Sequence, residues 1–379
     1  MNIFADSHHE ELCSALVRLF CKRLGHKLYF PGLGEDGSCG WFHYEDGGGI
    51  MQWGNPMTKD WVQRAFSNRF LVEDPGYSTW LESYRRIPTY PKEKIDFEIS
   101  EKDHTAVGYG ASPVEEDIGA YPVSFLEFQD LQVDLLLCTC TQNMNTFRVL
   151  RDLKPNAKMA YQAGNNEFVF DYDLGLNLMS SATIPYNNAP EKVHKVYYWQ
   201  EFDMDLRFVD IGPPKEEFER TIRCYQHYIQ TLSWFHNWEK LKSSVNAELI
   251  SHGAGNDKDL SSLGWSIPFA IRDSVASVHS KNSDGYGFNI AHSLVMGRPI
   301  IGNFSECVGQ TREFWLRPSL SMLHCDPCDY VDFENVVKRY IDSSQMKIDM
   351  YYSTIYFVRP QFDFGEEASK VADWLENLQ

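Results

Sequence analysis

A late segment of the chain combines residue types that bind anions. An apolar stretch at 275–278 leads through Lys281 to the turn Asp284-Gly285-Tyr286-Gly287, and a helical pattern begins near Asn289. Glycines let a backbone approach a ligand closely, and the first amide groups of a helix attract phosphate. Lys281 and Arg272 would add positive charge, and the Asp284 carboxylate would accept hydrogen bonds from hydroxyl groups. These residues predict a site for a sugar attached to a diphosphate; a plain turn is the structural alternative.

Polar residues also follow three other apolar stretches that are typical of strands. They are His8 and His9 after 2–5, Gln162, Gly164 and Asn165 after 158–161, and His252 after 248–251. Open α/β sheets bind ligands at the carboxyl ends of their strands. We therefore expect His8 and His9 to contact one of the substrates, either the donor or the acceptor of a transferred group. We expect the amides near Gln162 to bind sugar hydroxyls and His252 to contact a base or a phosphate. Ordinary turns and a solvated helix end are the alternatives.

The segment at 278–301 resembles the donor-binding motif of GT-B glycosyltransferases, particularly of the family-4-like retaining group. In that group an acidic residue opens a Gly-aromatic-Gly turn, and a second acidic residue follows eight positions later on a helix. A Gly-x-Pro and a strand come next, here Gly297-Arg298-Pro299 and 300–301. Asp284 stands where the family usually has Glu, and His292 stands where it usually has the second acidic residue.

The resemblance implies roles for individual residues. It implies donor binding by Gly285, Tyr286, Gly287 and Phe288, a ribose contact at His292, and a base contact at His252 and Gly253. It also implies that the first loop, with His9, lies over the diphosphate, so Asp284 and His9 are the candidate catalytic residues. The likeness covers most of 1–30 and 130–379 and is weak over 31–120.

Hydrophobic periodicity predicts the elements that position these residues. Strands are expected at 2–5, 26–30, 133–138, 158–162, 248–251, 274–279 and 299–302, and helices at 10–24, 143–153, 216–238, 289–296, 333–343 and 366–378. Strands that alternate with helices are typical of parallel sheets. The chain is therefore expected to have an α/β fold with two Rossmann-like domains.

Three parts of the chain follow from this pattern and from the resemblance. We expect an N-terminal Rossmann-like acceptor domain at 1–188, with an irregular insertion at about 31–120. A C-terminal Rossmann-like donor domain for the nucleotide sugar would occupy 189–357. The helix at 358–379 would cross over and pack back on the N-terminal domain, and the GT-B arrangement implies that the two domains face a cleft.

Composition excludes several classes of protein. The 379 residues carry 35 Lys+Arg and 53 Asp+Glu, a net charge of −18, which argues against a protein that coats nucleic acid. The nine cysteines are an odd number and predict reduced thiols. The first residues do not form a signal peptide, and no apolar stretch reaches 18 residues. We therefore expect a soluble cytoplasmic protein with no transmembrane segment.

Other motifs carry less information. Cys325-Asp326-Pro327-Cys328 lacks the second ligand pair of a zinc site. Asp-x-Asp triplets at 171–173 and 203–205 match the metal-binding pattern of GT-A enzymes, but the two-domain pattern argues against that use. Walker and Gly-x-Ser-x-Gly motifs are absent from the sequence. We expect no metal and no cofactor beyond the nucleotide sugar, such as a UDP- or GDP-sugar.

The function expected is transfer of a sugar from a nucleotide-sugar donor to a hydroxyl acceptor. Amides at 285–288, together with Arg272 and Lys281, would stabilise the leaving diphosphate without a metal. The resemblance implies a retaining reaction, and His292 at the second acidic position leaves inversion open as the alternative. The acceptor could be a saccharide, a lipid-linked sugar, a protein or a modified, hydroxylated nucleobase. A sugar-nucleotide epimerase of GT-B fold and a non-catalytic sugar-binding protein are the alternatives.

Overall fold

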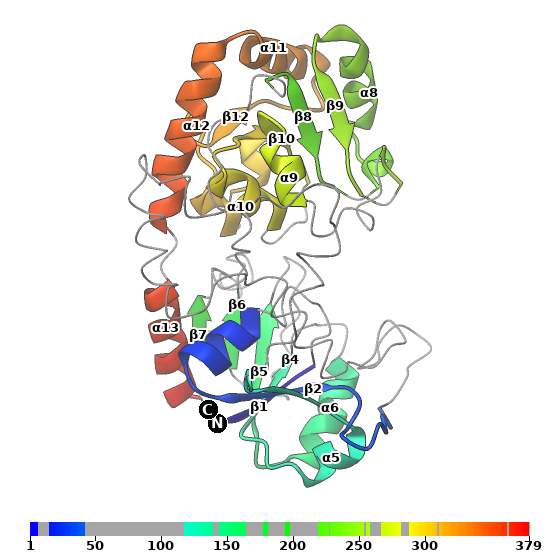
Figure 1. Cartoon of the computed structure of the whole chain (residues 1–379), viewed down its shortest axis with the longest axis vertical. Helices are drawn as coiled ribbons and strands as arrows, with labels where there is room; N and C mark the ends of the chain where they lie inside the picture. The colour runs from blue at the N-terminus through cyan, green and yellow to red at the C-terminus, as the bar shows by residue number, and fades with distance from the viewer. Residues whose placement is uncertain are drawn as a thin grey trace. The chain divides into compact units, whose positions relative to one another are not determined.

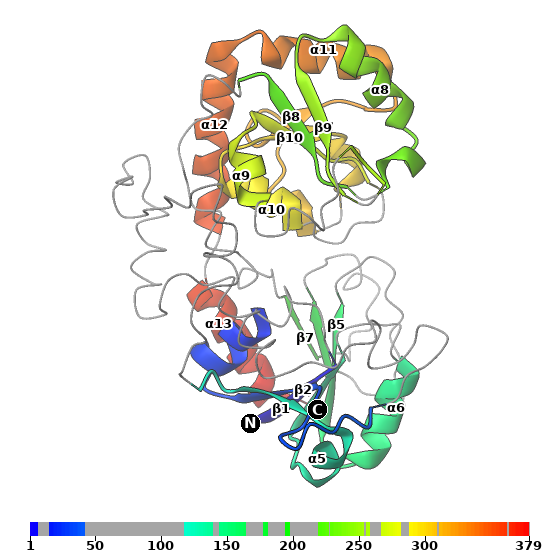
Figure 2. The ribbon, with the colours of Figure 1, turned by 45° about the vertical axis from the view of Figure 1, so that its right-hand side comes forward.

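A computed structural model describes most of the chain in two compact units. The described residues are 1–6, 15–41, 117–138, 144–163, 177–180, 194–197, 219–226, 228–253, 255–257, 267–281, 288–308, 311–361 and 364–378. Unit 1 contains the described residues up to 197 and the last helix, and unit 2 contains those from 219 to 361. Figures 1 and 2 show a sheet with flanking helices in each unit.

Unit 1 is built on seven parallel strands in the order β3-β2-β1-β4-β5-β6-β7. They are β1 (Asn2–Ala5), β2 (Lys27–Pro31), β3 (Ala120–Val123), β4 (Leu135–Cys138), β5 (Lys158–Ala163), β6 (Asn177–Ser180) and β7 (His194–Tyr197). The strand order reverses between β1 and β4, where Ile3 pairs with Leu135. All four residues of β4 are buried, as expected for a parallel strand covered on both faces.

The helices of unit 1 are η1, a π-helix (Val17–Arg23), α5 (Phe125–Asp130), α6 (Met144–Leu153) and α13 (Phe364–Glu376). Helix α5 begins with a capping box in which Ser124 and Glu127 each accept a backbone N–H of the other. Helix α13 packs against β7 and buries Val371 and Trp374, so the last element of the chain belongs to the first unit.

Unit 2 is built on five parallel strands in the order β12-β11-β10-β8-β9. They are β8 (Thr221–Cys224), β9 (Glu248–Ser251), β10 (Ala276–Val278), β11 (Ile300–Gly302) and β12 (Met322–His324). The order reverses between β8 and β10, where Cys224 pairs with Val278. This is the order of a doubly wound sheet.

Helices surround the sheet of unit 2. They are η9 (Ile229–Thr231), α8 (Phe235–Ser244), α9 (Ile267–Arg272), α10 (Phe288–Val295), η12 (Phe304–Glu306), η13 (Thr311–Phe314), α11 (Tyr330–Ile341), α12 (Ser344–Val358) and η14 (Arg359–Gln361). Trp234 and Trp238 pack with Phe333 in the core, and the Tyr340 hydroxyl donates to the Val275 carbonyl at 2.9 Å. Helix α10 packs on β10 and β11, with α9 and α12 beside it.

The predicted α/β class with two Rossmann-like sheets is confirmed. One predicted helix, at 216–238, is wrong, because its described part contains strand β8 and only then η9 and the start of α8. All four residues of β8 are buried, which a strand in the middle of the sheet requires. Helix α12 was not predicted, and the domain limits at 188 and 357 and the insertion at about 31–120 stay predictions.

Helix α10 is followed by a glycine whose backbone no other residue adopts easily. Gly297 has φ +73°, and a Cβ added there would lie 2.4 Å from Cδ2 of Tyr351 on α12. Gly25 has nearly the same φ, +72°, but has open space where a Cβ would be. Substitutions at the two glycines therefore distinguish the cost of backbone strain from the cost of crowding.

We predict that Gly297→Ala lowers the stability of unit 2 by about 2–4 kcal/mol, because left-handed strain adds to overpacking. Gly25→Ala should cost only the backbone part, about 1–2 kcal/mol. Thermal unfolding of both variants checks this. Equal losses would show that Tyr351 moves aside without cost.

Candidate functional site

The candidate site lies where the strand order of unit 2 reverses. Ligands of open α/β sheets bind outside the carboxyl ends of the strands at such a point. Here β8 is followed by Tyr225 and Gln226, and β10 by Ser280 and Lys281. The segment at 282–287, which we call the glycine segment, connects Lys281 to α10. It contains Asp284, Gly285, Tyr286 and Gly287, and all of these lie outside the described residues.

Two side chains tie the ends of β8 and β10 together. The Gln226 amide accepts from the Ser280 N–H and donates to the Ser280 carbonyl, both at 3.2 Å. Trp234 Nε1 also donates to this carbonyl, at 3.0 Å, and the Ser280 hydroxyl donates to the Glu306 carboxylate at 2.7 Å. Gln226, Trp234 and Ser280 are buried. The backbone that leads into the glycine segment is therefore held on several sides.

Helix α10 is held at both ends. Near its start, Asn289 Nδ2 donates to the Tyr225 carbonyl at 3.4 Å. At its end, the buried Arg359 guanidinium donates twice to the Val295 carbonyl, at 2.8 and 3.0 Å, and Arg298 donates to the Met296 carbonyl at 2.8 Å. Cations at the carboxyl end of a helix complement its dipole. Phe288, the first residue of α10, directly follows the glycine segment.

His292 lies on α10 with a side chain that is 6% exposed. It directly precedes Ser293, whose hydroxyl contacts that of Ser277 at 2.8 Å, so it lies in the packed part of the helix. The ribose contact that the resemblance implies for His292 stays a prediction.

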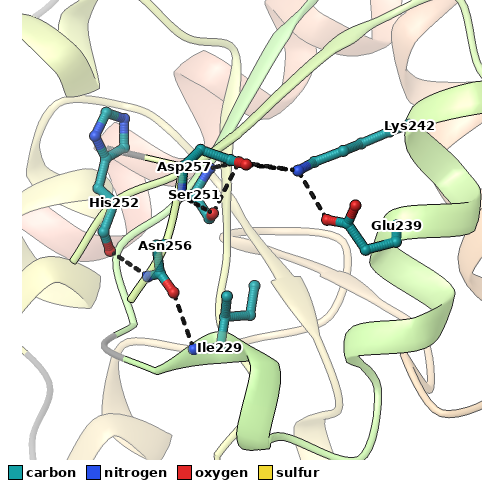
Figure 3. Close-up of polar contacts among 7 residues, drawn as sticks. All are labelled: Ile229, Glu239, Lys242, Ser251, His252, Asn256 and Asp257. Carbon is teal, nitrogen blue, oxygen red and sulfur yellow. Dashed lines mark hydrogen bonds and ion pairs between the residues drawn. The ribbon is translucent and has the colours of Figure 1, made fainter. Parts of the chain in front are cut away.

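The carboxyl end of β9 carries a network of polar contacts (Figure 3). Asn256 donates to the His252 carbonyl at 2.8 Å and accepts from the Ile229 N–H at 3.0 Å. Asp257 accepts from the N–H and the hydroxyl of Ser251, at 2.9 and 2.8 Å, and Lys242 donates to both of its oxygens at 2.9 Å. The network joins η9, α8 and the turn after β9.

Hydrogen bonds hold the pKa of Asp257 below its usual value. Burial acts to raise this pKa, but the hydrogen bonds from Ser251 and Lys242 outweigh it. For Lys242, burial acts to lower the pKa, and its partners Glu239 and Asp257 raise it above the ordinary value. The pair is therefore ionised at neutral pH.

His252 is part of the interior. Its Nε2 lies 2.9 Å from Arg223 Nη1, and its ring stacks on Tyr225 with centroids 5.1 Å apart. A guanidinium has only donors, so Nε2 accepts and the imidazole carries its proton on Nδ1. His252 is 1% exposed and Gly253 is also buried. The base contact expected of both stays a prediction, and the geometry gives the His252 side chain a structural role.

The two expected cations lie at different edges of the sheet. Lys281 is exposed and follows the carboxyl end of β10. Arg272 ends α9, ahead of the amino end of β10, and its Nε and Nη2 donate to Asp273 at 2.6 and 2.9 Å. Asp273 already neutralises this guanidinium. The structure therefore does not support the diphosphate role that the sequence suggested for Arg272.

In unit 1 the strand order reverses between β1 and β4. Asp6 follows β1, is buried, and donates its N–H to the Leu137 carbonyl at 3.2 Å. His8 and His9 come just after it, outside the described residues, as do Gly164 and Asn165. Gln162 on β5 is 3% exposed, and in the described part of the chain neither its amide oxygen nor its nitrogen has a hydrogen-bond partner.

The cysteine pair does not form a metal site with its described neighbours. Cys325 is buried, and burial raises the pKa of its thiol to about 12, whereas Cys328 is exposed and contacts the Ser233 hydroxyl at 3.2 Å. Within the described ranges no three His, Cys, Asp or Glu side chains gather as metal ligands. Both Asp-x-Asp triplets lie outside those ranges.

Sequence reasoning missed Gln226, Ser280, Glu306 and Arg312. Gln226 was assigned to a helix, so its place at a strand end could not be recognised. Arg312, between β11 and β12, carries no motif signal at all.

Comparison with solved structures covers the whole chain. HepE of Anabaena in complex with UDP matches 100% of this chain and 99% of its own, with a TM-score of 0.58 and 8% identity. Its complex with UDP-glucose has a TM-score of 0.56 over the same shares, also at 8% identity. Sucrose-phosphate synthase of Thermosynechococcus elongatus matches 99% of this chain and 98% of its own, with a TM-score of 0.54 and 8% identity.

The chain has the GT-B fold.

Among the comparisons with known proteins, only those with solved structures found matches. No protein-family profile matches the sequence. No curated protein matches it either. TarM of S. aureus also aligns, at 11% identity and a TM-score of 0.46, over 64% of this chain, which spans about half (55%) of TarM. Within the described part of this GT-B chain, no helix has the length and apolar character needed to cross a bilayer.

We predict that Gln226→Ala lowers stability by about 1–3 kcal/mol, because the buried Ser280 N–H loses its acceptor. As a matched control, Gln345→Ala removes only an exposed hydrogen bond to Asp349 on α12 and should cost less than about 0.5 kcal/mol. Thermal unfolding measures both. A loss no larger than that of the control would show that water replaces Gln226.

We also predict a pH-dependent contribution from Asp257. Its folded-state pKa lies below the unfolded value of about 3.9. The stabilisation is therefore complete above that value and is lost as the pH falls through the lower folded-state pKa. Asp257→Asn should melt below the wild type at pH 7, and the gap should close in acid. The exposed Asp342→Asn, which loses an ion pair with Arg220, is the control with little change at either pH. A gap that is constant with pH would contradict the assignment.

Proposed function

We propose that this chain transfers a sugar from a nucleotide-sugar donor to a hydroxyl acceptor. The observation that carries the proposal is the place of the glycine segment at 282–287. It leaves the point where the strand order of unit 2 reverses, from a strand end that Gln226 and Trp234 hold, and it leads directly into α10. HepE, whose complexes contain UDP and UDP-glucose, has the same fold over its full length and supports this reading.

Unit 2 would bind the donor. Backbone N–H groups of Gly285, Tyr286, Gly287 and Phe288 would donate hydrogen bonds to the diphosphate, and Lys281 would add a charge beside them. Because α10 is held at both ends, these donors need no reorganisation as charge develops on the leaving group. A metal is not required in this scheme, since fixed dipoles and a cation supply the compensation.

The Asp284 carboxylate would bind hydroxyl groups of the donor sugar, close to the anomeric carbon. The transition state is oxocarbenium-like, so a nearby carboxylate favours it electrostatically. The resemblance at 284–299 supports retention of the anomeric configuration. Because His292 replaces the second acidic residue, inversion stays open as the alternative, and the anomeric configuration of the product decides between the two.

Unit 1 would contact the acceptor and the transferred sugar. Gln162 has amide atoms that are buried and unpaired in the described part of the chain, at the carboxyl end of β5. Unpaired buried amides are costly, and hydroxyl groups of a ligand would satisfy them. His8, His9, Gly164 and Asn165 follow strand ends of the same sheet edge. The acceptor would be a hydroxyl-bearing molecule. The high negative charge argues against nucleic acid, and a modified, hydroxylated nucleobase stays among the acceptors to be tested.

A screen of nucleotide sugars by melting temperature tests the proposal. A UDP- or GDP-sugar at about 100 times its dissociation constant would stabilise the protein by about 2.7 kcal/mol. The best donor should then be hydrolysed slowly without an acceptor and transferred when one is supplied. Nucleotide sugars that neither stabilise the protein nor react would refute the assignment.

The same incubation separates two other functions. Conversion of the donor sugar to its epimer, with no release of free sugar, would identify a GT-B epimerase. Binding without hydrolysis, transfer or epimer formation would identify a non-catalytic sugar-binding protein. The buried His292 in place of an acidic residue is the observation that favours this last candidate.

We predict that Asp284→Ala lowers the transfer rate at least about 100-fold, because the carboxylate that faces the reacting sugar is lost. The melting temperature should stay close to that of the wild type. Asp349→Ala, a change of the same kind on the exposed side of α12, is the matched control and should leave the rate unchanged. Wild-type turnover in Asp284→Ala would remove the residue from the mechanism.

A further inference from the structure

Arg312 is a buried cation with no carboxylate partner among the described residues. Its side chain, on η13, is 0% exposed. Nη2 donates to the carbonyls of Lys281 and Glu306, at 2.6 and 3.0 Å. In the described part of the chain, Nε and Nη1 have no hydrogen-bond partner and no acidic side chain lies within ion-pair distance. The Glu306 carboxylate accepts from Ser280 instead.

This arrangement is costly unless something compensates it. An arginine stays protonated in proteins, so the guanidinium cannot escape its burial by losing a proton. A buried charge without a partner is strongly unfavourable, and two carbonyl groups supply only partial negative charge. Other buried arginines of unit 2 serve the helix end at Val295 and Met296 or bond to His252. Arg312 likewise bonds to backbone carbonyls, but these carbonyls follow two different strands, β10 and β11.

The charge lies at the candidate site. Lys281 is the last described residue before the glycine segment, and Ser280 holds the end of β10 to Glu306. Arg312 reaches this point from the connection between β11 and β12. A charge in a low-dielectric interior acts over several ångströms with little screening. Its field therefore favours an anion at the carboxyl end of β10.

We infer that Arg312 is the buried counter-charge for a pyrophosphate group bound after β10. It is a positioning residue, which acts through its field and through the Lys281 backbone that it anchors. The inference deepens the proposed function and rests on it for the nature of the ligand. In this arrangement the cation for the diphosphate comes from Arg312 on the β11–β12 connection, and not from Arg272 at the end of α9.

The test uses inorganic pyrophosphate and UDP as separate probes, with binding followed by calorimetry and by melting temperature. Arg312→Met should weaken pyrophosphate binding about 10- to 100-fold, since one full charge is lost. Arg312→Lys keeps the charge and can donate to both carbonyls, so its affinity should stay within about threefold of the wild type. Uridine, which has no phosphate, should bind all variants equally.

Arg317→Met is the matched control. Arg317 follows η13 on the same connection and donates to the carbonyls of Glu313 and Leu316, but it lies ahead of the amino end of β12. Its loss should change pyrophosphate affinity less than about twofold.

Three results would overturn the inference. Equal pyrophosphate affinity in Arg312→Met and the wild type would remove Arg312 while the proposed function stands. A parallel loss of uridine and pyrophosphate binding in Arg312→Met would indicate a merely structural role. A wild type that binds neither pyrophosphate nor any nucleoside diphosphate would overturn this inference and the proposed function together. If Arg312→Met does not fold, the lysine variant decides, because a tenfold loss there would contradict a role based on charge.

Discussion

The paired hydrogen bonds between Gln226 and Ser280 are the constraint on which the candidate site depends. Adjacent strands in a sheet are joined along their length, but the backbone beyond their ends is free to diverge. At the reversal of strand order, the gap between β8 and β10 is where a ligand fits, and it is also where the sheet gives least support. A side-chain amide that mimics a further pair of backbone bonds extends the sheet by one step without closing the gap.

Helix α10, which follows the glycine segment, is also fixed at its carboxyl end. Two buried guanidinium groups bond to the last carbonyls of α10, from Arg298 just after the helix and from Arg359 more than sixty residues later. Their charges compensate the negative end of the helix dipole. Buried charge is thus arranged at the carboxyl end of one short helix of eight residues, and Arg312 bonds to the Lys281 carbonyl, just before the segment that leads into this helix. Buried arginines in the interior of unit 2 would thus support anion binding at the carboxyl ends of its strands.

Elements with strong local patterns could be predicted from the sequence alone. Buried strands such as 135–138 and 300–302, and the order of strands and helices around them, could be predicted from apolar runs and turn residues. Strand β8 could not, because its four residues lie in a longer stretch with helical spacing and only its neighbours in the sheet decide its state. Arg272 and Arg312 show the same limit for the site. Arg272 lies ahead of the amino end of β10, whereas Arg312 bonds to the backbone after the carboxyl end of that strand. The residue type is the same, so only the fold shows which of the two lies at the candidate site.

Helix α13 has a consequence for how the protein is made. Strand β7 is the outermost described strand of its sheet, and the helix that packs against it is separated from it in the chain by unit 2. Unit 2 is synthesised before that helix, so it can acquire its structure while the edge of unit 1 is still uncovered. Exposed edges favour pairing with other chains. The interval between translation of β7 and of α13 is therefore the period in which a nascent chain is most vulnerable to misassociation and in which chaperones would matter most.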